Sequence, residues 1–159
     1  MPSGIYGGAG YGERVKPVPT KTSVLLFDSH EEVLSALAPR LKMVADLDVV
    51  GETGSLSRAL DIAARVKPGL IIADFGPSGA YAAAMCARIS QVSPESKLVV
   101  YTPFADEAMR QMYADAGATA CLLKDIGSKG LVRELQHLIS GDGASRASRP
   151  VRRGPGCGG

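Results

Sequence analysis

The stretch PGLIIADFGPSG, residues 68–79, places a single acid between an apolar run and a turn-forming segment. The run GLIIAD (69–74) is too short for an ordinary helix and is bounded by turn residues, so it predicts a buried strand. The glycines and the proline that follow predict a turn. Asp74 is therefore expected where a buried strand ends and the chain leaves the sheet.

The same alternation of a short apolar run with a longer segment of helical period recurs five times along the chain. The predicted strands are 23–27, 47–52, 69–74, 97–102 and 118–124, and the predicted helices are 30–45, 55–66, 80–92, 106–117 and 127–140. Strands that are apolar throughout and separated by helices indicate a parallel sheet with helices on both faces. The predicted fold class is α/β, a doubly wound five-stranded parallel sheet in three layers.

Local signals refine two of the predicted helices. Ser55 is expected to cap the amino end of the second helix. Pro39 interrupts the apolar stripe of the first helix and removes the amide that would bond back to Ser35. The first helix should therefore be kinked or shortened near this proline.

The ends of the chain differ in composition from the middle. A Gly/Pro-rich leader (1–22) and a basic Gly/Arg-rich tail (141–159) are both expected to be disordered, which leaves 23–140 as the folded domain. The formal net charge is +2, yet residues 24–140 carry 11 basic and 14 acidic side chains. This balance argues against direct nucleic-acid binding by the folded domain.

Cysteine usage and hydropathy indicate the compartment. Cys86, Cys121 and Cys157 form an odd set without CxxC spacing, which favours neither a disulfide framework nor a zinc site. No apolar run approaches the length of a membrane span, and the leader lacks a continuous apolar signal segment. A cytoplasmic protein without membrane contact is expected.

Polar residues with complementary chemistry end the predicted strands. In chain order these residues are Asp28, Glu52, Asp74, Thr102 and Lys124. The carboxyl ends of strands are where doubly wound sheets place their functional groups. Taken singly, Asp28 or Asp74 is equally a turn former or helix cap, Thr102 is ordinary in a β-rich run, and Lys124 is usually a solvated charge. The set without Glu52 favours a divalent cation on the carboxylates and a phosphoryl group on the hydroxyl and the ammonium. Such neutralisation is what phosphoryl transfer to a carboxylate requires.

The chain resembles the receiver domains of two-component response regulators, most closely those of the LuxR/NarL-like group. The blocks that carry the likeness are VLLFDSHEEVLSAL (24–37), VVGETGSLSRAL (49–60), PGLIIADFGPSG (68–79), LVVYTPFADE (98–107) and AGATACLLKDI (116–126). The resemblance extends over about residues 22–140. It implies the flavodoxin-like receiver fold and a role in phosphorelay signalling, not that of an enzyme.

The resemblance also implies roles for individual residues. Asp74 would accept a phosphoryl group from a histidine kinase or another phosphodonor. Mg²⁺ would be held by Asp28, Asp74 and the backbone carbonyl of Gly76. Thr102 and Lys124 would bind the phosphoryl oxygens and couple phosphorylation to the face formed by the fourth helix, the fifth strand and the last helix.

Three positions depart from the family pattern. Ser29 stands where a second acid is usual, so Mg²⁺ should bind weakly and phosphorylation should slow. Pro103 lacks the backbone amide that commonly donates to the phosphoryl group. Cys121 replaces the aromatic residue that rotates inward in most members, and it reads as a core-filling thiol. These departures predict weakened phosphorylation.

The sequence is compatible with several alternatives. A pseudoreceiver would act as an interaction or dimerisation module without phosphate. A flavodoxin-like cofactor site is disfavoured because the acids of DSHEE (28–32) would repel a flavin phosphate, and His30 and His137 lack a nucleophile partner for hydrolysis. The tail is too short and too rich in glycine for a helix-turn-helix, so the chain is either a single-domain regulator or the receiver part of a longer DNA-binding regulator.

A homodimer is a further expectation. The last predicted helix carries more apolar residues than one sheet face requires, namely Leu131, Val132, Leu135, Leu138 and Ile139. Pairing of two copies through this helix would cover the excess apolar surface.

Overall fold

The computed structural model describes residues 20–76 and 79–141. The elements in chain order are β1 (Thr22–Asp28), α1 (Glu31–Lys42), β2 (Leu47–Thr53), α2 (Leu56–Val66), β3 (Leu70–Asp74), α3 (Gly79–Val92), β4 (Lys97–Thr102), α4 (Glu107–Asp115), β5 (Ala120–Leu123), the 3₁₀ turn η1 (Lys124–Ile126) and α5 (Gly127–Ser140). The predicted leader and tail fall almost entirely outside the described residues.

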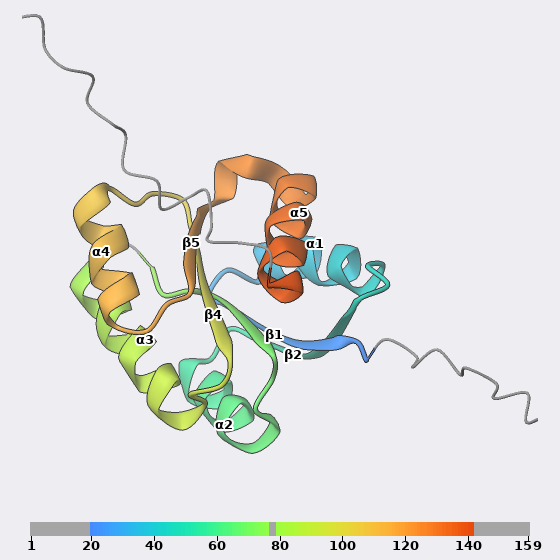
Figure 1. Ribbon diagram of the computed structural model, residues 1–159, viewed down its shortest axis with the longest axis horizontal. Helices are drawn as coiled ribbons and strands as arrows, with labels where there is room; N and C mark the ends of the chain where they lie inside the picture. Colours follow the sequence, from blue (N-terminus) through green and yellow to red (C-terminus); the bar gives the residue numbers. More distant parts are fainter. Residues whose placement is uncertain (1–19, 77–78, 142–159) are drawn as a thin grey trace, which may run out of the picture.

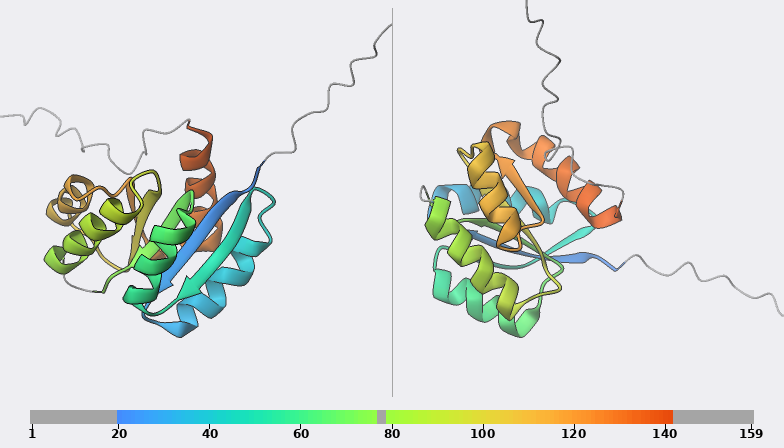
Figure 2. Two further views of the ribbon diagram at one scale, coloured as in Figure 1. Left: turned by 90° about the horizontal axis from the view of Figure 1, so that it is seen from below. Right: turned by 60° about the vertical axis from the view of Figure 1, so that its left-hand side comes forward.

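The strands form one parallel sheet in the order β2-β1-β3-β4-β5. Helices α1 and α5 cover one face of this sheet, and α2, α3 and α4 cover the other (Figures 1 and 2). The predicted α/β class, the doubly wound parallel sheet and the three layers are confirmed. In such a sheet the strand order reverses beside the first strand, which places β1 and β3 at the usual site of function.

The sheet is apolar on both faces because each central strand is covered twice. In β1, Val24 and Leu26 pack toward α1 and α5, while Leu25 and Phe27 pack toward α2 and α3. All five residues of β3 are buried. Burying both sides of a strand removes the polar alternation of an exposed sheet, which is why these strands read as continuous apolar runs.

Helix ends follow the predicted chemistry. The hydroxyl of Ser55 accepts a hydrogen bond from the amide of Arg58 at 3.4 Å, and this confirms the predicted cap of α2. Pro39 lies inside α1, which ends at Lys42 and not at residue 45. The first helix is thus shorter than the predicted 30–45, but it continues through Pro39 and does not end there.

The last strand is shorter than predicted. β5 ends at Leu123, the partner of Thr102 in β4, and Lys124 already belongs to the 3₁₀ turn η1. The predicted strand 118–124 was too long at both ends, since pairing with β4 begins at Ala120 and stops at Leu123. Lys124 leaves the sheet there and turns toward β1 and β3. Its ammonium contacts acids at the ends of both those strands.

The edge of the sheet contains one irregularity. In the pairing of β1 with β2, Val24 lies opposite Val49 and Leu25 lies opposite Gly51, so Val50 is an extra residue on the edge strand. Val50 is one of the exposed large apolar residues. This arrangement is a β-bulge, which locally increases the twist of the strand.

The apolar residues of α5 are used within the domain. Leu131, Leu135 and Leu138 are buried against the sheet, and Val132 and Ile139 are partly buried against the same cluster. The apolar surplus that suggested a dimer is thus largely covered, and dimerisation itself stays a prediction. Among the described residues, no helix is both long enough and apolar enough to cross a membrane.

Candidate functional site

Two carboxylates lie side by side at the carboxyl edge of the sheet. Asp28 ends β1 and Asp74 ends β3, and the two residues are direct partners in the parallel pairing of these strands. Their exposed fractions are 3% and 4%. Two buried carboxylates at neighbouring strand ends repel one another, and a nearby cation offsets this repulsion.

Lys124 supplies a positive charge from the turn that follows β5. Its Nζ atom lies 2.6 Å from Asp28 Oδ2 and 2.7 Å from Asp74 Oδ2. The ammonium therefore reaches over β4 to the ends of the two neighbouring strands, as the predicted convergence of strand ends required.

The environment of Lys124 shifts its titration. Burial is the largest single effect and would lower the pKa of Lys124, but hydrogen bonds to Asp28 and Asp74 and the charges of both acids together raise this pKa above its ordinary value. The lysine is therefore held in its charged form. It also lies 5.8 Å from the ring centroid of Tyr101, within the range of a cation–π contact.

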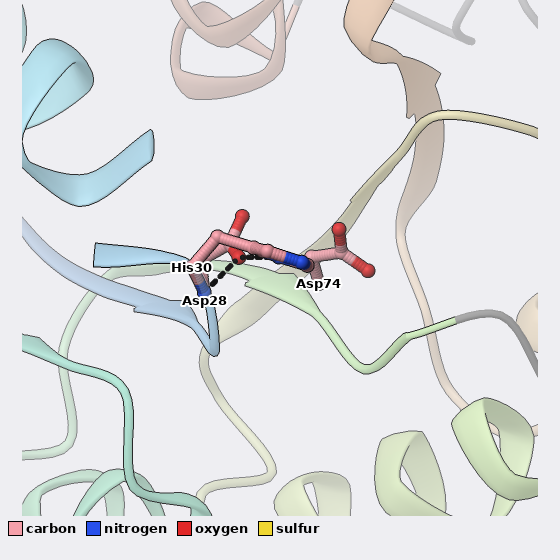
Figure 3. Close-up of side chains that lie close together, drawn as sticks. All are labelled: Asp28, His30 and Asp74. Carbon is pink, nitrogen blue, oxygen red and sulfur yellow. Dashed lines mark hydrogen bonds and ion pairs between the residues drawn. The ribbon is translucent and has the colours of Figure 1, made fainter. Parts of the chain in front are cut away.

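His30 belongs to the same cluster, a role that was not predicted from the sequence. Its backbone amide donates to Asp28 Oδ1 at 2.9 Å, and its ring Nδ1 lies 3.1 Å from the same oxygen. Figure 3 shows the imidazole next to Asp28, extending toward Asp74. One donor atom from each of Asp28, His30 and Asp74 lies within 4.8 Å of the other two. The available signal was the Asx turn, in which an Asp side chain accepts a hydrogen bond from the backbone amide two residues on, and this turn brings residue 30 beside Asp28.

The donor set fits a divalent cation. Asp28 and Asp74 offer the carboxylate oxygens that hard cations prefer, and His30 adds a nitrogen donor. Ser29 is exposed and adds no second carboxylate after β1. The site therefore holds fewer acids than the usual receiver pattern.

The turn after β3 is shaped around Asp74. The amide of Gly76 donates to Asp74 Oδ1 at 2.9 Å. Gly76 has a φ of 90°, a left-handed value that side chains other than glycine rarely adopt. The turn thus fixes one oxygen of Asp74, while the predicted role of the Gly76 carbonyl toward a metal stays a prediction.

Thr102 and Pro103 lie at the end of β4. Thr102 is buried, and its hydroxyl donates to the carbonyl of Phe104 at 3.2 Å. Contact with a phosphoryl group would require this hydroxyl to leave its own loop. Pro103 is exposed and offers no amide to a ligand.

Cys121 lies on one face of the sheet, and Tyr101, which is close to Lys124, lies on the other. Its thiol is buried in the cluster beneath α2, α3 and α4, and its carbonyl accepts a hydrogen bond from Arg110 Nη1 at 2.9 Å. Burial raises the pKa of the Cys121 thiol, so the thiolate is disfavoured. The description of Cys121 as a core-filling residue agrees with this position.

A groove adjoins the cluster between α1 and α5. It has a volume of about 320 Å³, and its lining includes Glu32, Arg40, Tyr101, Lys124 and Ser128. Arg40 of α1 donates to the hydroxyl of Ser128 on α5 and so joins the two helices beside the groove.

Glu52 lies away from this cluster. The end of β2 brings it beside α1, where its carboxylate lies 3.6 Å from the ammonium of Lys42. The predicted site does not include Glu52, and this placement is consistent with that prediction.

Comparison with known proteins supports the assignment of the fold. The family model for the response regulator receiver domain matches residues 24–136. The chain is 32% identical over 101 residues to the transcriptional regulatory protein LiaR of Bacillus subtilis, covering 64% of this chain and 48% of LiaR. It is 31% identical over 119 residues to the DNA-binding transcriptional activator DevR/DosR of Mycobacterium tuberculosis, covering 74% of this chain and 54% of that protein.

A solved structure gives the same result for the fold. The signal receiver domain of the putative response regulator NarL from Mycobacterium tuberculosis superposes with a TM-score of 0.69 at 21% identity, covering 77% of this chain and 99% of that domain. The chain spans about half the length of the curated relatives that it matches.

Proposed function

Because this chain belongs to the response regulator receiver domain family, within the LuxR/NarL group, we propose that it accepts a phosphoryl group on Asp74. Two-component signalling is the process in which such domains act. The observation that carries the proposal is the contact of Lys124 with both Asp28 and Asp74.

The chemistry follows from the charges at the site. One carboxylate oxygen of Asp74 attacks the phosphorus of a histidine kinase phosphohistidine or of another phosphodonor, and the donor's leaving group departs. A divalent cation on Asp28 and Asp74 would offset the charge that builds up between two anions. Lys124 is close enough to Asp74 to stabilise the phosphoryl oxygens, as a preorganised cation.

Binding of the phosphoryl group would be coupled to β4 through Thr102. Its hydroxyl is now satisfied by Phe104, so engagement of a phosphoryl oxygen replaces one hydrogen bond by another. Such an exchange pulls the loop after β4 toward the site. The expected output is a change at the face of α4, β5 and α5, where Arg110 of α4 binds the Cys121 carbonyl of β5.

Phosphorylation is expected to be weaker than in a complete receiver. Ser29 adds no carboxylate for Mg²⁺, and Pro103 adds no amide for the phosphoryl group. A charge-assisted hydrogen bond contributes roughly 1.5 to 3 kcal/mol, so the loss of one such donor disfavours the phosphorylated state by about that amount. Mg²⁺ is therefore proposed as a weakly held ion.

The test is direct phosphorylation of the full chain. Incubation with acetyl phosphate and Mg²⁺ should add the mass of one phosphoryl group, and peptide mapping should place it on Asp74. The Asp74→Asn variant is the matched control and should gain no mass. Absence of any gain in the unmodified chain, with beryllofluoride also leaving its spectrum unchanged, would reject the proposal.

A second candidate is a pseudoreceiver that works without phosphate. The observation in its favour is that the site is already paired internally: Lys124 contacts both acids, and Thr102 bonds within its own loop. Its output would depend on a protein partner or on a homodimer involving α5. Inertness toward phosphodonors together with partner binding by the Asp74→Asn variant would favour this candidate.

The relatives suggest how the output would be delivered. LiaR and DevR/DosR are regulators of transcription, and the chain matches about half of each. We propose that this domain controls a DNA-binding partner or domain and does not contact nucleic acid itself. A filter-binding assay with residues 20–141 and duplex DNA should therefore show no retention at physiological salt.

A further inference from the structure

We propose that His30 is a metal ligand and that the Asp28–His30–Asp74 cluster prefers a divalent metal that accepts imidazole, such as Zn²⁺, Ni²⁺ or Cu²⁺, over Mg²⁺. The role of the ion in phosphorylation rests on the proposed function, and the inference adds which class of ion the site prefers. Ser29 supplies no carboxylate to the site, and the neighbouring His30 offers a nitrogen donor.

The first support is the position of His30 relative to α1. His30 is the N-cap residue of this helix, where a side chain ordinarily accepts a hydrogen bond from the first turn. Ser55 and Asp106 do this for α2 and α4. The imidazole of His30 makes no cap hydrogen bond. Its orientation is therefore not explained by the helix that it precedes.

The second support is what the imidazole contacts instead. Its Nδ1 atom lies 3.1 Å from Asp28 Oδ1, within a group of donors that are all within 4.8 Å of one another. The side chain of His30 is 63% exposed, so an ion can reach the nitrogen from solvent. Both acids are anchored by their strands and buried, which fixes two of the three donors in advance.

Lys124 and His30 use different atoms of Asp28. The ammonium contacts Oδ2 of both acids, whereas His30 contacts Oδ1 of Asp28. A metal bound on the Oδ1 side of Asp28 leaves the lysine on the opposite oxygen. The lysine then orients the carboxylate, as groups that hydrogen-bond to metal ligands do in other metal sites.

The donor chemistry decides the class of ion. Mg²⁺ prefers an octahedron of oxygen atoms and is seldom held by imidazole, while Zn²⁺, Ni²⁺ and Cu²⁺ accept imidazole readily. The lack of an acid at Ser29 weakens the binding of an ion that depends on carboxylate charge. The nitrogen of His30 strengthens the binding of an ion that accepts nitrogen ligands. The two changes favour the transition metal together.

The experiment compares metal affinities without a phosphodonor. The full chain is prepared without an affinity tag and with Cys157→Ser, since a free thiol in the tail would itself bind Zn²⁺. Calorimetric titrations with Mg²⁺, Mn²⁺ and Zn²⁺ give the affinity ratios. The informative quantity is the change of the Zn²⁺/Mg²⁺ ratio on mutation, because most sites of any kind bind Zn²⁺ more tightly than Mg²⁺.

His30→Ala should lower the Zn²⁺/Mg²⁺ affinity ratio by at least about tenfold, a loss that even supporting residues of metal sites produce. His137→Ala is the matched control, because His137 is an exposed histidine on α5, and it should leave the ratio unchanged. Ser29→Asp should restore oxygen chemistry and raise Mg²⁺ affinity. Pulsed electron paramagnetic resonance with Cu²⁺ should detect an imidazole nitrogen that His30→Ala removes.

An unchanged ratio in His30→Ala, an equal loss in His137→Ala, or a nitrogen signal that survives without His30 would each overturn the proposal. The proposed function is tested separately by mass gain on Asp74. A chain that never gains a phosphoryl group with any ion can still show the His30-dependent ratio, and a phosphorylated chain can lack it. The two failures are thus distinguishable.

Discussion

Asp28 lies directly opposite Asp74 in the register of β1 and β3, so the two buried carboxylates leave neighbouring strands at the same level of the sheet. This relationship creates the need for a cation. Lys124 meets that need by contacting one oxygen of each acid. Structural stability and the proposed chemistry therefore depend on the same three side chains.

Replacing Lys124 should destabilise the fold. Lys124→Met leaves two buried acids without their counter-charge, and breaking a buried ion pair on one side costs about 3 to 5 kcal/mol. Urea denaturation should show a decrease in unfolding free energy of that order. Lys129→Met removes an exposed lysine of α5 and should change stability by no more than about 0.5 kcal/mol. Equal effects of the two substitutions would contradict the assigned role of Lys124.

The same ion pairs give stability a dependence on high pH. The pKa of Lys124 is raised above its ordinary value of 10.5, so the folded state holds this proton more tightly than the unfolded state. The resulting stabilisation is fully present below about pH 10.5 and is lost as the pH rises through the folded-state pKa. The stability difference between the unmodified chain and Lys124→Met should therefore shrink above that pH. A difference that stays constant to pH 12 would refute the assignment.

Returning an amide after Thr102 should strengthen phosphoryl binding. Pro103→Ala restores an N–H group to the loop after β4 and adds a donor that contributes at least about 1.5 kcal/mol, or roughly tenfold in affinity. Titration with beryllofluoride, followed by nuclear magnetic resonance, measures the gain. Pro94→Ala, an exposed proline after α3, should leave affinity unchanged. Equal affinity in the Pro103 variant and the parent chain would mean that this loop does not border the phosphoryl group.

The turn after β3 should not tolerate a side chain at Gly76. A Cβ atom there meets nothing within 4 Å, so the penalty comes only from the φ of 90°. Gly76→Ala should lower the unfolding free energy by about 1 to 3 kcal/mol. Gly76→Asn should lose less, because Asn adopts left-handed backbone more readily than Ala. Thermal denaturation distinguishes these two outcomes from no effect.

The core cysteines should be chemically silent in the folded state. Burial raises the pKa of Cys86 to about 12 and also raises the pKa of Cys121. In the Cys157→Ser background, Ellman's reagent at pH 8 should leave both thiols unmodified until urea is added, when both should react. Rapid reaction of Cys121 in the native protein would instead indicate that the fifth strand opens easily.

The sequence predicts the framework well because its signals there are local and repeated. The bounds of β4 and α5 agree with the predicted 97–102 and 127–140. The convergence of Asp28, Asp74 and Lys124 also follows, since parallel strands end at one edge.

What the sequence does not predict depends on turns. Lys124 was expected in the last strand because the apolar run before it gives no sign of where pairing stops. The part played by His30 depends on a two-residue turn that folds its ring onto Asp28. The hydrogen bond of Thr102 likewise depends on the path of the loop to Phe104. None of these follows from periodicity.

The bulge at Val50 affects the tendency of the protein to aggregate. An outer strand with a regular row of unpaired amides and carbonyls invites a strand from another molecule to extend it, which is a common origin of fibres. The extra residue between Val49 and Gly51 breaks that row. Deleting Val50 would straighten the border of the sheet and should make concentrated solutions of the protein prone to self-assembly.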